Sequence, residues 1–313
     1  PNDTATAYVR VANVNDESVQ LRKGQILADL EPVSVLPRPD PASLATPAHI
    51  AEMLAKVDPS VAEPYKSRLE ALLTKYAHAF SANELDLGWT DLVKHSIDIG
   101  ENPPVRQALR KVPLTQRSII DKHIDEQLRQ GIIEPSRSPF AANLVIVKKP
   151  DGSTRCCCDY RGLNLVSKRD AYPLPRIDQC LDALGGGRNR WFTCLDLRSG
   201  FYQVAMNESD VDKTAFICHR GLFAHKTLPM GLKNSPATFQ RLMDLTLDGL
   251  LFETCLAYLD DIILFSSTLE EHLQRLEAVL QRLVATGLKL KPSKCRLLQT
   301  KVVFLGHVVS SEG

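Results

Sequence analysis

The sequence predicts an α+β fold built from mixed strands and helices. Segments with an apolar strand pattern and segments with helical spacing follow one another without the regular strand–helix alternation of a doubly wound parallel sheet. The sequence contains no repeat at the periods of solenoid proteins. At 313 residues the chain is long enough for about two domains with a buried core.

The first third of the chain is expected to contain a small β-rich segment, a linker and a helix. Residues 1–36 hold short strand patterns that are separated by turn residues. Residues 37–94 open with a proline-rich linker and continue with a helix over Ala62–Ala79. The segment Ser81–Trp89 that follows has no regular pattern.

The middle of the chain contains one helix and three strands by the same criteria. The helix should begin at Thr115, where an apolar stripe starts, and end at Gly131, since glycine readily adopts the left-handed conformation after a helix. A strand, a tight turn and a second strand are expected over Asn143–Tyr160. Trp191–Leu197 is a further apolar strand.

A helix and two apolar strands are expected next. Ser235-Pro236 marks the start of the helix, with the serine as its cap and the proline at the first helical position. The apolar strands Thr254–Ala257 and Ile262–Phe265 then flank a short polar segment.

The C-terminal part should contain one more helix and a final strand. The helix is expected to start at a capping box formed by Thr268 and Glu271 and to end at Gly287. Val302–Val309 closes the chain as a strand.

Charge is distributed unevenly along the chain, although the net charge is only +1. Residues 1–95 contain 9 Lys and Arg against 13 Asp and Glu, whereas residues 96–313 contain 29 against 24. A mildly basic body is compatible with binding to nucleic-acid phosphates. It is equally compatible with an ordinary solvated surface.

The sequence favours an intracellular protein with no membrane partner. No apolar run approaches the roughly 20 residues that a membrane span needs, and no signal-peptide pattern is present. The chain begins at Pro1 rather than Met, which suggests a piece of a longer protein. The eight cysteines, three of them consecutive at Cys156–Cys158, lack histidines at zinc spacing and are expected to be small buried hydrophobic residues.

Three aspartates at the ends of apolar strands are the strongest chemical signal. Asp260 and Asp261 lie between two such strands, and Asp196 ends another. Neighbouring strand residues face opposite ways, so two strands side by side would bring Asp196 and Asp260 over one face. Buried carboxylates need a cation, and oxygen ligands suit Mg²⁺ or Mn²⁺. The alternative is that Asp260 and Asp261 merely cap an exposed turn.

Six sequence blocks stand in a fixed order over the last two-thirds of the chain. They are Arg155–Arg161, Leu195–Phe201, Lys213–Phe216, Leu228–Pro236, Tyr258–Asp261 and Phe304–His307. Their order and spacing resemble the reverse transcriptases of gypsy-type LTR retrotransposons, which are RNA-directed DNA polymerases encoded within Pol polyproteins. The resemblance runs from about residue 95 to residue 313.

This resemblance implies the architecture of a right-hand polymerase, with an antiparallel sheet backed by helices. The fingers would cover about residues 95–190 and the palm about residues 191–313, and the thumb would be absent. Residues 1–36 resemble the β-rich segment between protease and polymerase in such polyproteins.

The resemblance also assigns roles to the acidic residues and to one lysine. Asp196 and Asp260 would be the principal ligands of two Mg²⁺ or Mn²⁺ ions, and Asp261 would complete the triad. Two such ions suit in-line phosphoryl transfer. Lys294 resembles the lysine proposed to protonate the departing pyrophosphate.

Five further residues would surround the incoming nucleotide. In this family, residues such as Lys148 and Arg155 hold the triphosphate, and Phe201 would exclude a ribose 2′-hydroxyl. Gln203 and the stretch that includes Met230 would form the floor beneath the templating pair, and Met230 departs from the Phe that gypsy elements mostly carry. Phe304–His307 resembles the primer grip, a tight hairpin.

The implied partners are an RNA or DNA template with its primer and deoxynucleoside triphosphates (dNTPs). The remaining Pol domains, namely the thumb, RNase H and integrase, would lie in the parent polyprotein, in a cytoplasmic virus-like particle. The competing hypothesis is a catalytically silent or domesticated Pol-derived nucleic-acid-binding fragment.

Overall fold

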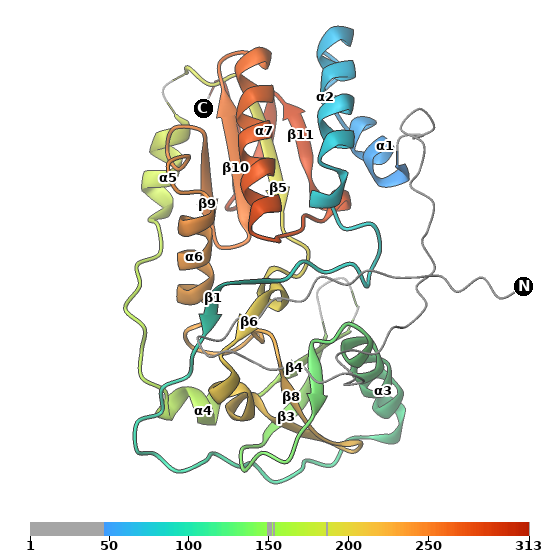
Figure 1. The fold of residues 1–313 in the computed structure, drawn as a ribbon, viewed down its shortest axis with the longest axis vertical. Coiled ribbons are helices and arrows are strands. Elements are labelled where there is room, and N and C mark those ends of the chain that lie inside the picture. Colours follow the sequence, from blue (N-terminus) through green and yellow to red (C-terminus); the bar gives the residue numbers. More distant parts are fainter. Residues whose placement is uncertain (1–46, 149–151, 153, 186, 313) are drawn as a thin grey trace, which may run out of the picture. The chain divides into compact units, whose positions relative to one another are not determined.

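Two larger sheets organise the part of the chain that the structure describes (Figure 1). The structure is a computed structural model, and it describes residues 47–148, 152, 154–185 and 187–312. The predicted β-rich segment over residues 1–36 therefore lies outside the described residues, as does most of the proline-rich linker.

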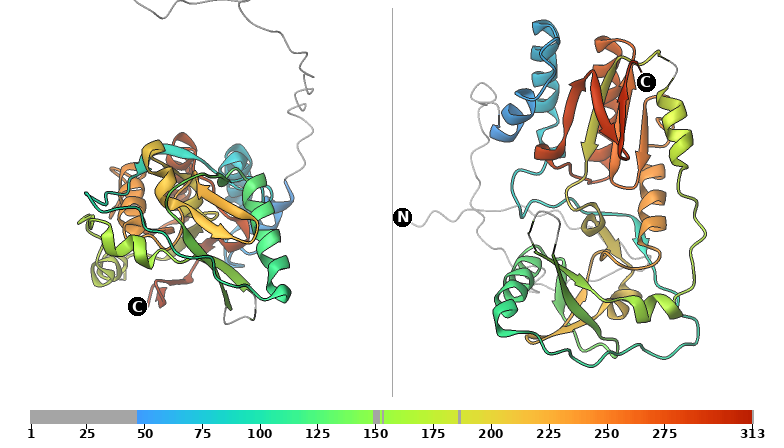
Figure 2. Two further views of the ribbon diagram at one scale, coloured as in Figure 1. Left: turned by 90° about the horizontal axis from the view of Figure 1, so that it is seen from below. Right: turned by 180° about the vertical axis from the view of Figure 1, so that it is seen from behind.

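The first sheet has five strands in the order β2-β8-β7-β3-β4. Its neighbouring strands are antiparallel except β3 and β7, which run parallel. The helices α3 and α4 lie beside it (Figures 1 and 2). The bounds are β2 Ile133–Pro135, β3 Ala142–Lys148, β4 Thr154–Cys158, β7 Phe216–Cys218, β8 Gly221–His225, α3 Leu114–Arg129 and α4 Arg161–Val166.

Helix α3 confirms the predicted helix that ends before Gly131. Strands β3 and β4 confirm the predicted strand pair over Asn143–Tyr160. The first sheet also contains β7 and β8, which lie after residue 190 in the sequence. A division into fingers and palm at residue 190 would therefore separate strands that belong to one sheet.

The second sheet carries the three aspartates and has the order β11-β5-β10-β9, with every neighbouring pair antiparallel. Three helices, α5, α6 and α7, accompany it (Figure 2). The bounds are β5 Trp191–Asp196, β9 Cys255–Tyr258, β10 Asp261–Ser266, β11 Arg296–Gln299, α5 Ile177–Leu184, α6 Ser235–Thr246 and α7 Leu269–Ala285.

Both faces of this second sheet are covered, which explains why its strands are almost wholly apolar. On β10, Ile262 and Leu264 belong to the cluster that includes the buried leucines of α7. The alternate residues Ile263 and Phe265 pack instead with Leu184 of α5 and with the C-terminal hairpin. The position of the aspartates at the ends of β5 and β10 is thereby fixed by a rigid core.

Helix α7 starts and ends as the sequence predicts. The Thr268 side chain accepts a hydrogen bond from the Glu271 backbone N–H, and Gly287 has a left-handed φ of 74°. The predicted cap of α6 is wrong, because Asn234 occupies the cap position. Ser235 is the first helical residue, and its hydroxyl donates to the Pro229 carbonyl instead.

The C-terminal segment forms two strands rather than the single strand predicted over Val302–Val309. Strands β12 Lys301–Phe304 and β13 His307–Ser310 pair antiparallel. The two residues between them, Leu305 and Gly306, both have positive φ, as a tight hairpin turn requires. The tight hairpin expected at Phe304–His307 is thus confirmed.

The segment before the first sheet contains the predicted helix as α2 Glu63–Lys75, continued by a 3₁₀ turn at Ala77–Ala79. Ion pairs join α2 to α7, from Arg68 to Glu270 and from Lys75 to Glu277. Two short elements of this segment were not predicted, namely α1 Ala48–Leu54 and β1 Thr90–His95, and β1 pairs parallel with β6 Val204–Met206.

The eight cysteines are all free thiols. Four of them are buried, as expected for small hydrophobic residues, and Cys156–Cys158 and Cys194 are half-buried. Among the described residues, none of the helices has the length and apolar character needed to cross a membrane.

Candidate active site

The ladder between β5 and β10 brings two of the three aspartates together. Asp261, the first residue of β10, pairs with Asp196, the last residue of β5. On its other side, Asp261 pairs with Tyr258 at the end of β9. Directly opposed residues of antiparallel strands present their side chains on the same face, roughly 5 Å apart. The register therefore makes Asp196 and Asp261 neighbours.

Asp260 lies in the turn between β9 and β10 rather than in the ladder. The turn consists of Leu259 and Asp260, and Leu259 has a left-handed φ of 54°. The expectation that strand pairing would set Asp260 opposite Asp196 is therefore wrong. Asp260 still lies within electrostatic reach of both neighbours, because its charge raises the pKa of Asp196 and of Asp261.

Burial is the largest cause of the raised pKa of both Asp196 and Asp261, and repulsion from the neighbouring carboxylates adds to it. Lys294 opposes the shift, since its Nζ donates a hydrogen bond to Oδ2 of Asp196 at 2.8 Å. The other oxygen of that carboxylate, Oδ1, is buried and has no hydrogen-bond partner in the described part of the chain. An unsatisfied oxygen among repelling carboxylates is costly, and either a bound cation or protonation would relieve that cost.

These carboxylate oxygens fit a hard divalent cation such as Mg²⁺ or Mn²⁺. Among the residues that the structure describes, however, no three acidic, histidine or cysteine side chains converge closely enough to hold a metal ion. Asp196, Asp260 and Asp261 are thus coupled through their charges, but they do not form a ready three-ligand site.

A pocket of about 410 Å³ extends from the aspartates to the C-terminal hairpin. Asp196, Asp261 and Lys294 line one side of it, and Phe304 and Leu305 line the other. The predicted primer grip thus borders the same space as the acidic residues.

Phe201 directly follows Gly200, a residue close to Asp260. It belongs to the 3₁₀ turn Gly200–Gln203, and its half-buried ring meets the edge of Phe239 with centroids 5.0 Å apart. A Cβ on Gly200 would be 2.8 Å from Phe239 and 3.4 Å from the Cβ of Asp260. Glycine is therefore required where this turn, one residue before Phe201, closely approaches Phe239 and Asp260.

The β3–β4 hairpin carries the two predicted triphosphate contacts. Lys148 is the exposed last residue of β3. Arg155 lies on β4, where it pairs with Val147 of β3. The guanidinium of Arg155 contacts the sulfur of Met230, in the loop before α6. The fold therefore joins Arg155 to Met230, which are 75 residues apart in the sequence.

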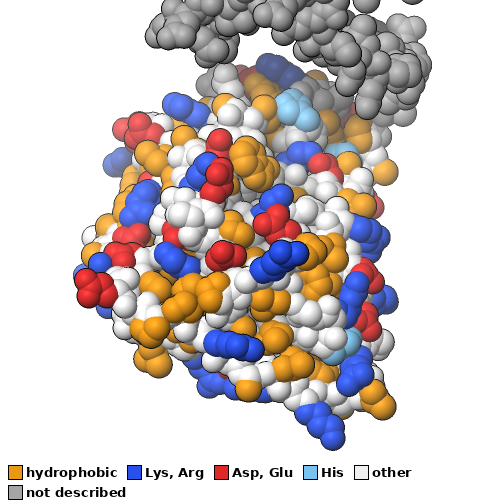
Figure 3. Space-filling model, turned by 60° about the horizontal axis from the view of Figure 1, so that its bottom comes forward, with side chains coloured by type: hydrophobic (Ala, Val, Ile, Leu, Met, Phe, Trp, Pro, Cys, Tyr) orange, Lys and Arg blue, Asp and Glu red, His pale blue; other side chains and the backbone are white. Residues whose placement is uncertain are grey.

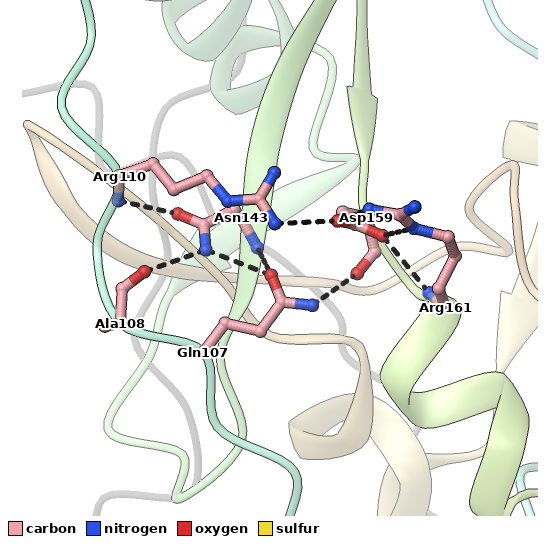
Figure 4. Close-up of polar contacts among 6 residues, drawn as sticks. All are labelled: Gln107, Ala108, Arg110, Asn143, Asp159 and Arg161. Atoms are coloured by element: carbon pink, nitrogen blue, oxygen red, sulfur yellow. Dashed lines mark hydrogen bonds and ion pairs between the residues drawn. The ribbon is translucent and has the colours of Figure 1, made fainter.

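A polar network braces the base of this hairpin (Figure 4). The nearly buried carboxylate of Asp159 accepts hydrogen bonds from Arg161 at 2.7 and 2.8 Å, and Arg110 approaches it at 3.4 Å. These arginines, Arg161 foremost, lower the pKa of Asp159. Asn143 of β3 accepts from the backbone N–H of Arg110 and donates to Gln107, both at 3.0 Å. No local sequence pattern indicates this network, although Asp159 and Arg161 lie within the block Arg155–Arg161.

Gln203 is fully buried. Its Nε2 donates to the carbonyls of Arg198 and Lys289 at 2.8 and 2.9 Å, and its Oε1 accepts from the Lys289 N–H at 2.8 Å. The backbone therefore occupies the amide, so Gln203 can contribute to the predicted floor beneath the templating pair only as a support inside the core.

Sequence comparisons agree with these features. The family described as "Reverse transcriptase (RNA-dependent DNA polymerase)" matches residues 147–309. The retrovirus-related Pol polyprotein from transposon 297 of Drosophila melanogaster is 38% identical over 251 residues, which cover 79% of this chain and 24% of that protein. The Tf2-3 polyprotein of Schizosaccharomyces pombe is 33% identical over 210 residues, which cover 66% and 16%. The chain thus spans about a quarter or less of the length of these relatives.

Solved structures share the same fold. The foamy viral protease-reverse transcriptase in complex with RNA/DNA hybrid has a TM-score of 0.78 and 26% identity, with 90% of this chain and 37% of that chain covered. The native Prototype Foamy Virus protease-reverse transcriptase has a TM-score of 0.74 and 28% identity, with 84% and 35% covered. This chain therefore belongs to the reverse transcriptase family, as the reverse transcriptase region of a gypsy-type LTR-retrotransposon Pol polyprotein.

Proposed function

We propose that this chain is the fingers-and-palm part of an RNA-directed DNA polymerase, a nucleotidyltransferase that extends a primer 3′-hydroxyl with dNTPs on an RNA or DNA template. The observation that carries the proposal is the acidic cluster at the end of β5 and β10. Asp196 and Asp261 pair across the ladder, Asp260 lies in the adjoining turn, and Oδ1 of Asp196 is buried without a partner among the described residues.

The cofactor in this proposal is a pair of divalent ions, Mg²⁺ or Mn²⁺. Asp196 and Asp260 are the principal ligands, and Asp261 completes the set. Ions held by these residues would activate the primer hydroxyl and neutralise charge on the leaving pyrophosphate. Burial and repulsion between carboxylates raise the pKa of Asp196 and of Asp261, and divalent ions bound there would neutralise this negative charge.

The fingers hairpin supplies the contacts to the triphosphate. Arg155 and Lys148 bind its oxygens, and Met230, in contact with Arg155, lies beneath the nucleotide. A charged pair on a hairpin is suited to closing over phosphates, because charge-assisted hydrogen bonds to phosphate are strong. Phe201 rejects ribonucleotides by colliding with a 2′-hydroxyl. Lys294 delivers a proton to the departing pyrophosphate from its place beside Asp196.

The proposed nucleic-acid partner is a primer–template duplex. One of the similar solved structures is a foamy viral enzyme in complex with an RNA/DNA hybrid. Lys and Arg side chains are spread over the end of the molecule that carries α3 and α4, with hydrophobic side chains and some Asp and Glu between them (Figure 3). Such a surface suits phosphate binding without marking one strongly basic patch.

The wider assignments rest on the same family resemblance. We assign residues 95–190 chiefly to fingers and residues 191–313 chiefly to palm, with β7 and β8 joining the fingers sheet. Thumb, RNase H and integrase domains would be supplied by the parent polyprotein, in a cytoplasmic virus-like particle.

The competing function is a catalytically silent, Pol-derived nucleic-acid-binding fragment. Primer extension on an RNA template distinguishes the two, measured for this chain and for the parent polyprotein. We expect Mg²⁺-dependent extension that Asp196→Asn and Asp260→Asn abolish, while Asp261→Asn leaves a trace. Primer–template binding should survive all three changes, because phosphate contacts by Lys and Arg do not involve these carboxylates. Binding without extension in the parent protein would favour the silent fragment, and extension by Asp196→Asn at the parental rate would exclude the site.

A further inference from the structure

The catalytic turn is held by a buried side chain of α6. Leu259, next to Asp260, adopts a left-handed conformation that a non-glycine residue rarely takes. Its backbone N–H donates to Oε1 of Gln240 at 2.9 Å, and Gln240 is fully buried. The conformation of the turn therefore depends on one acceptor that lies outside the β9–β10 hairpin.

The amide of Gln240 is itself fixed at its other end. Its Nε2 donates to Oδ1 of Asp244 at 2.9 Å and to the carbonyl of Ala257 at 3.2 Å. Since Ala257 lies in β9 and Leu259 in the turn, one amide bonds two successive points of the hairpin. Asp244 fixes which amide atom faces the turn, because a carboxylate accepts only from the NH₂ group.

Asp244 is anchored in turn by Tyr172, from the segment between α4 and α5. The Tyr172 hydroxyl donates to Oδ2 of Asp244 at 2.5 Å. Burial, followed by the bond to Asp244, raises the pKa of Tyr172 to about 12, so the phenol remains a donor over the ordinary pH range. Four residues thus form one continuous chain of hydrogen bonds, from Tyr172 through Asp244 and Gln240 to Leu259.

The beginning of this chain is held in place by an ion pair. Arg241 binds both oxygens of Asp170 at 3.0 and 2.8 Å, and its guanidinium lies 4.5 Å from the centre of the Tyr172 ring. The backbone N–H of Tyr172 also donates to Asp170 at 2.9 Å. The connecting segment is therefore seated on α6 at a defined position, and the tyrosine hydroxyl is aimed at Asp244.

We propose that Gln240, Asp244 and Tyr172 are positioning residues for polymerisation, which orient Asp260 by holding the left-handed Leu259 turn. This inference rests on the proposed polymerase function. None of the three touches the acidic cluster through a hydrogen bond, so they act through the backbone of the turn. Small displacements of catalytic groups lower rates steeply, by about 100-fold for about 1 Å.

We call the chain of hydrogen bonds from Tyr172 to Leu259 the relay, and we expect kcat to fall more when the bond that is removed lies closer to the turn. Gln240→Leu removes every bond to the turn and should lower kcat by about 100-fold. Tyr172→Phe removes only the first bond and keeps the ring under Arg241, so it should lower kcat several-fold. The KM for dNTP and the affinity for primer–template should stay within about twofold of the parent, because the groups that bind them are unchanged.

Amide hydrogen exchange supplies a readout that does not depend on activity. The exchange of the Leu259 amide should be fastest in Gln240→Leu, intermediate in Tyr172→Phe and slowest in the parent. Tyr76→Phe is the matched control, since it removes a phenol–carboxylate bond to Glu277 at 3.3 Å between α2 and α7. It should leave both kcat and the Leu259 exchange rate unchanged.

The possible results separate the two proposals. If the unmodified protein does not extend primers, the polymerase function fails, while Leu259 exchange still tests the relay. If extension is normal and Tyr172→Phe and Gln240→Leu leave kcat and Leu259 exchange at parental values, the relay is refuted. An equal loss of kcat in Tyr76→Phe would also refute it, since the effect would then be one of general stability.

Discussion

Nζ of Lys294 lies 2.8 Å from Oδ2 of Asp196, whereas Oδ1 of the same carboxylate is buried with no partner among the described residues. The lysine thus bonds one oxygen of the Asp196 carboxylate, while the other oxygen has no hydrogen-bond partner. The lysine competes with any cation for the negative charge of Asp196. In the proposed reaction, Lys294 also donates a proton to the departing pyrophosphate.

Replacing Lys294 should change metal binding and rate in opposite directions. Lys294→Met removes the competing cation, so Mn²⁺ should bind to the free protein more tightly, by roughly tenfold or about 1.4 kcal/mol. The same change removes the proton donor, so the maximal rate of extension should fall by about 100-fold. Mn²⁺ affinity is measured by titration calorimetry and the rate by single-turnover extension.

Lys294→Arg serves as the control for charge. It keeps the positive charge, so Mn²⁺ affinity should remain near the parental value. Arginine does not release its proton at ordinary pH, so the rate should still be low. A parental rate in Lys294→Arg would show that Lys294 supplies charge and not a proton.

Phe201 should set the choice between deoxyribo- and ribonucleotides. Its ring packs against Phe239, and the residue before it, Gly200, lies close to Asp260. Phe201→Val should open space for a 2′-hydroxyl and raise the relative use of ribonucleotides by about 100-fold, equivalent to about 3 kcal/mol. The ratio of kcat/KM for each pair of nucleotides measures this effect.

Phe201→Tyr is the matched variant, because it keeps a ring of the same width. It should exclude ribonucleotides nearly as well as the parent. An unchanged ratio in Phe201→Val would leave Phe201 as a core residue only.

The sequence predicted the aspartate positions because they depend on local patterns. Strand ends and helix ends follow from apolar alternation and from residues such as Gly287, whose left-handed conformation ends α7. The partner of Asp196 depends on register instead. Register is set when Leu259 takes a left-handed turn that removes Asp260 from the ladder, and no local pattern indicates this.

Pairings between distant segments were also beyond a single sequence. Ala142 pairs with Phe216 in a parallel ladder, and Gln203 binds the backbone of Lys289, 86 residues away. A polar residue that will be buried and satisfied by distant backbone has the same local appearance as one that binds a ligand. This is why Gln203 was assigned to the nucleotide pocket.

Three buried histidines should make stability depend on pH. Burial lowers the pKa of His95 to about 4 and that of His225 and His272 to about 3. In the unfolded chain each should titrate near its ordinary value of about 6.5. Below that value the unfolded chain binds more protons than the folded protein, so the free energy of unfolding falls as the pH is lowered.

The expected loss is up to about 1.4 kcal/mol per pH unit for each histidine, between about pH 6.5 and pH 4. Urea unfolding at a series of pH values measures it. His272→Gln should lower stability near pH 7, because His272 bonds Ser266 and Thr193, each at 2.8 Å. It should also reduce the slope with pH by about one histidine's share, and an unchanged slope would contradict the assignment.

Gln203 and Met230 should separate stability from nucleotide binding. Gln203→Leu leaves the carbonyls of Arg198 and Lys289 and the Lys289 N–H without their partner. Each unsatisfied buried group costs about 1–3 kcal/mol, so a loss of roughly 3 kcal/mol in the free energy of unfolding is expected. The KM for dNTP should change little, because the amide does not reach the pocket.

Met230→Ala should behave in the opposite way. Its half-buried side chain contacts the Arg155 guanidinium, so its removal should raise the KM for dNTP several-fold through a less ordered arginine. The free energy of unfolding of the Met230→Ala protein should stay within about 0.5 kcal/mol of the parent, as for substitutions outside the core. The measurements are urea unfolding and steady-state extension on the same preparations. A raised KM with unchanged stability in Gln203→Leu would restore Gln203 to the nucleotide pocket, because a purely internal clamp cannot produce that combination.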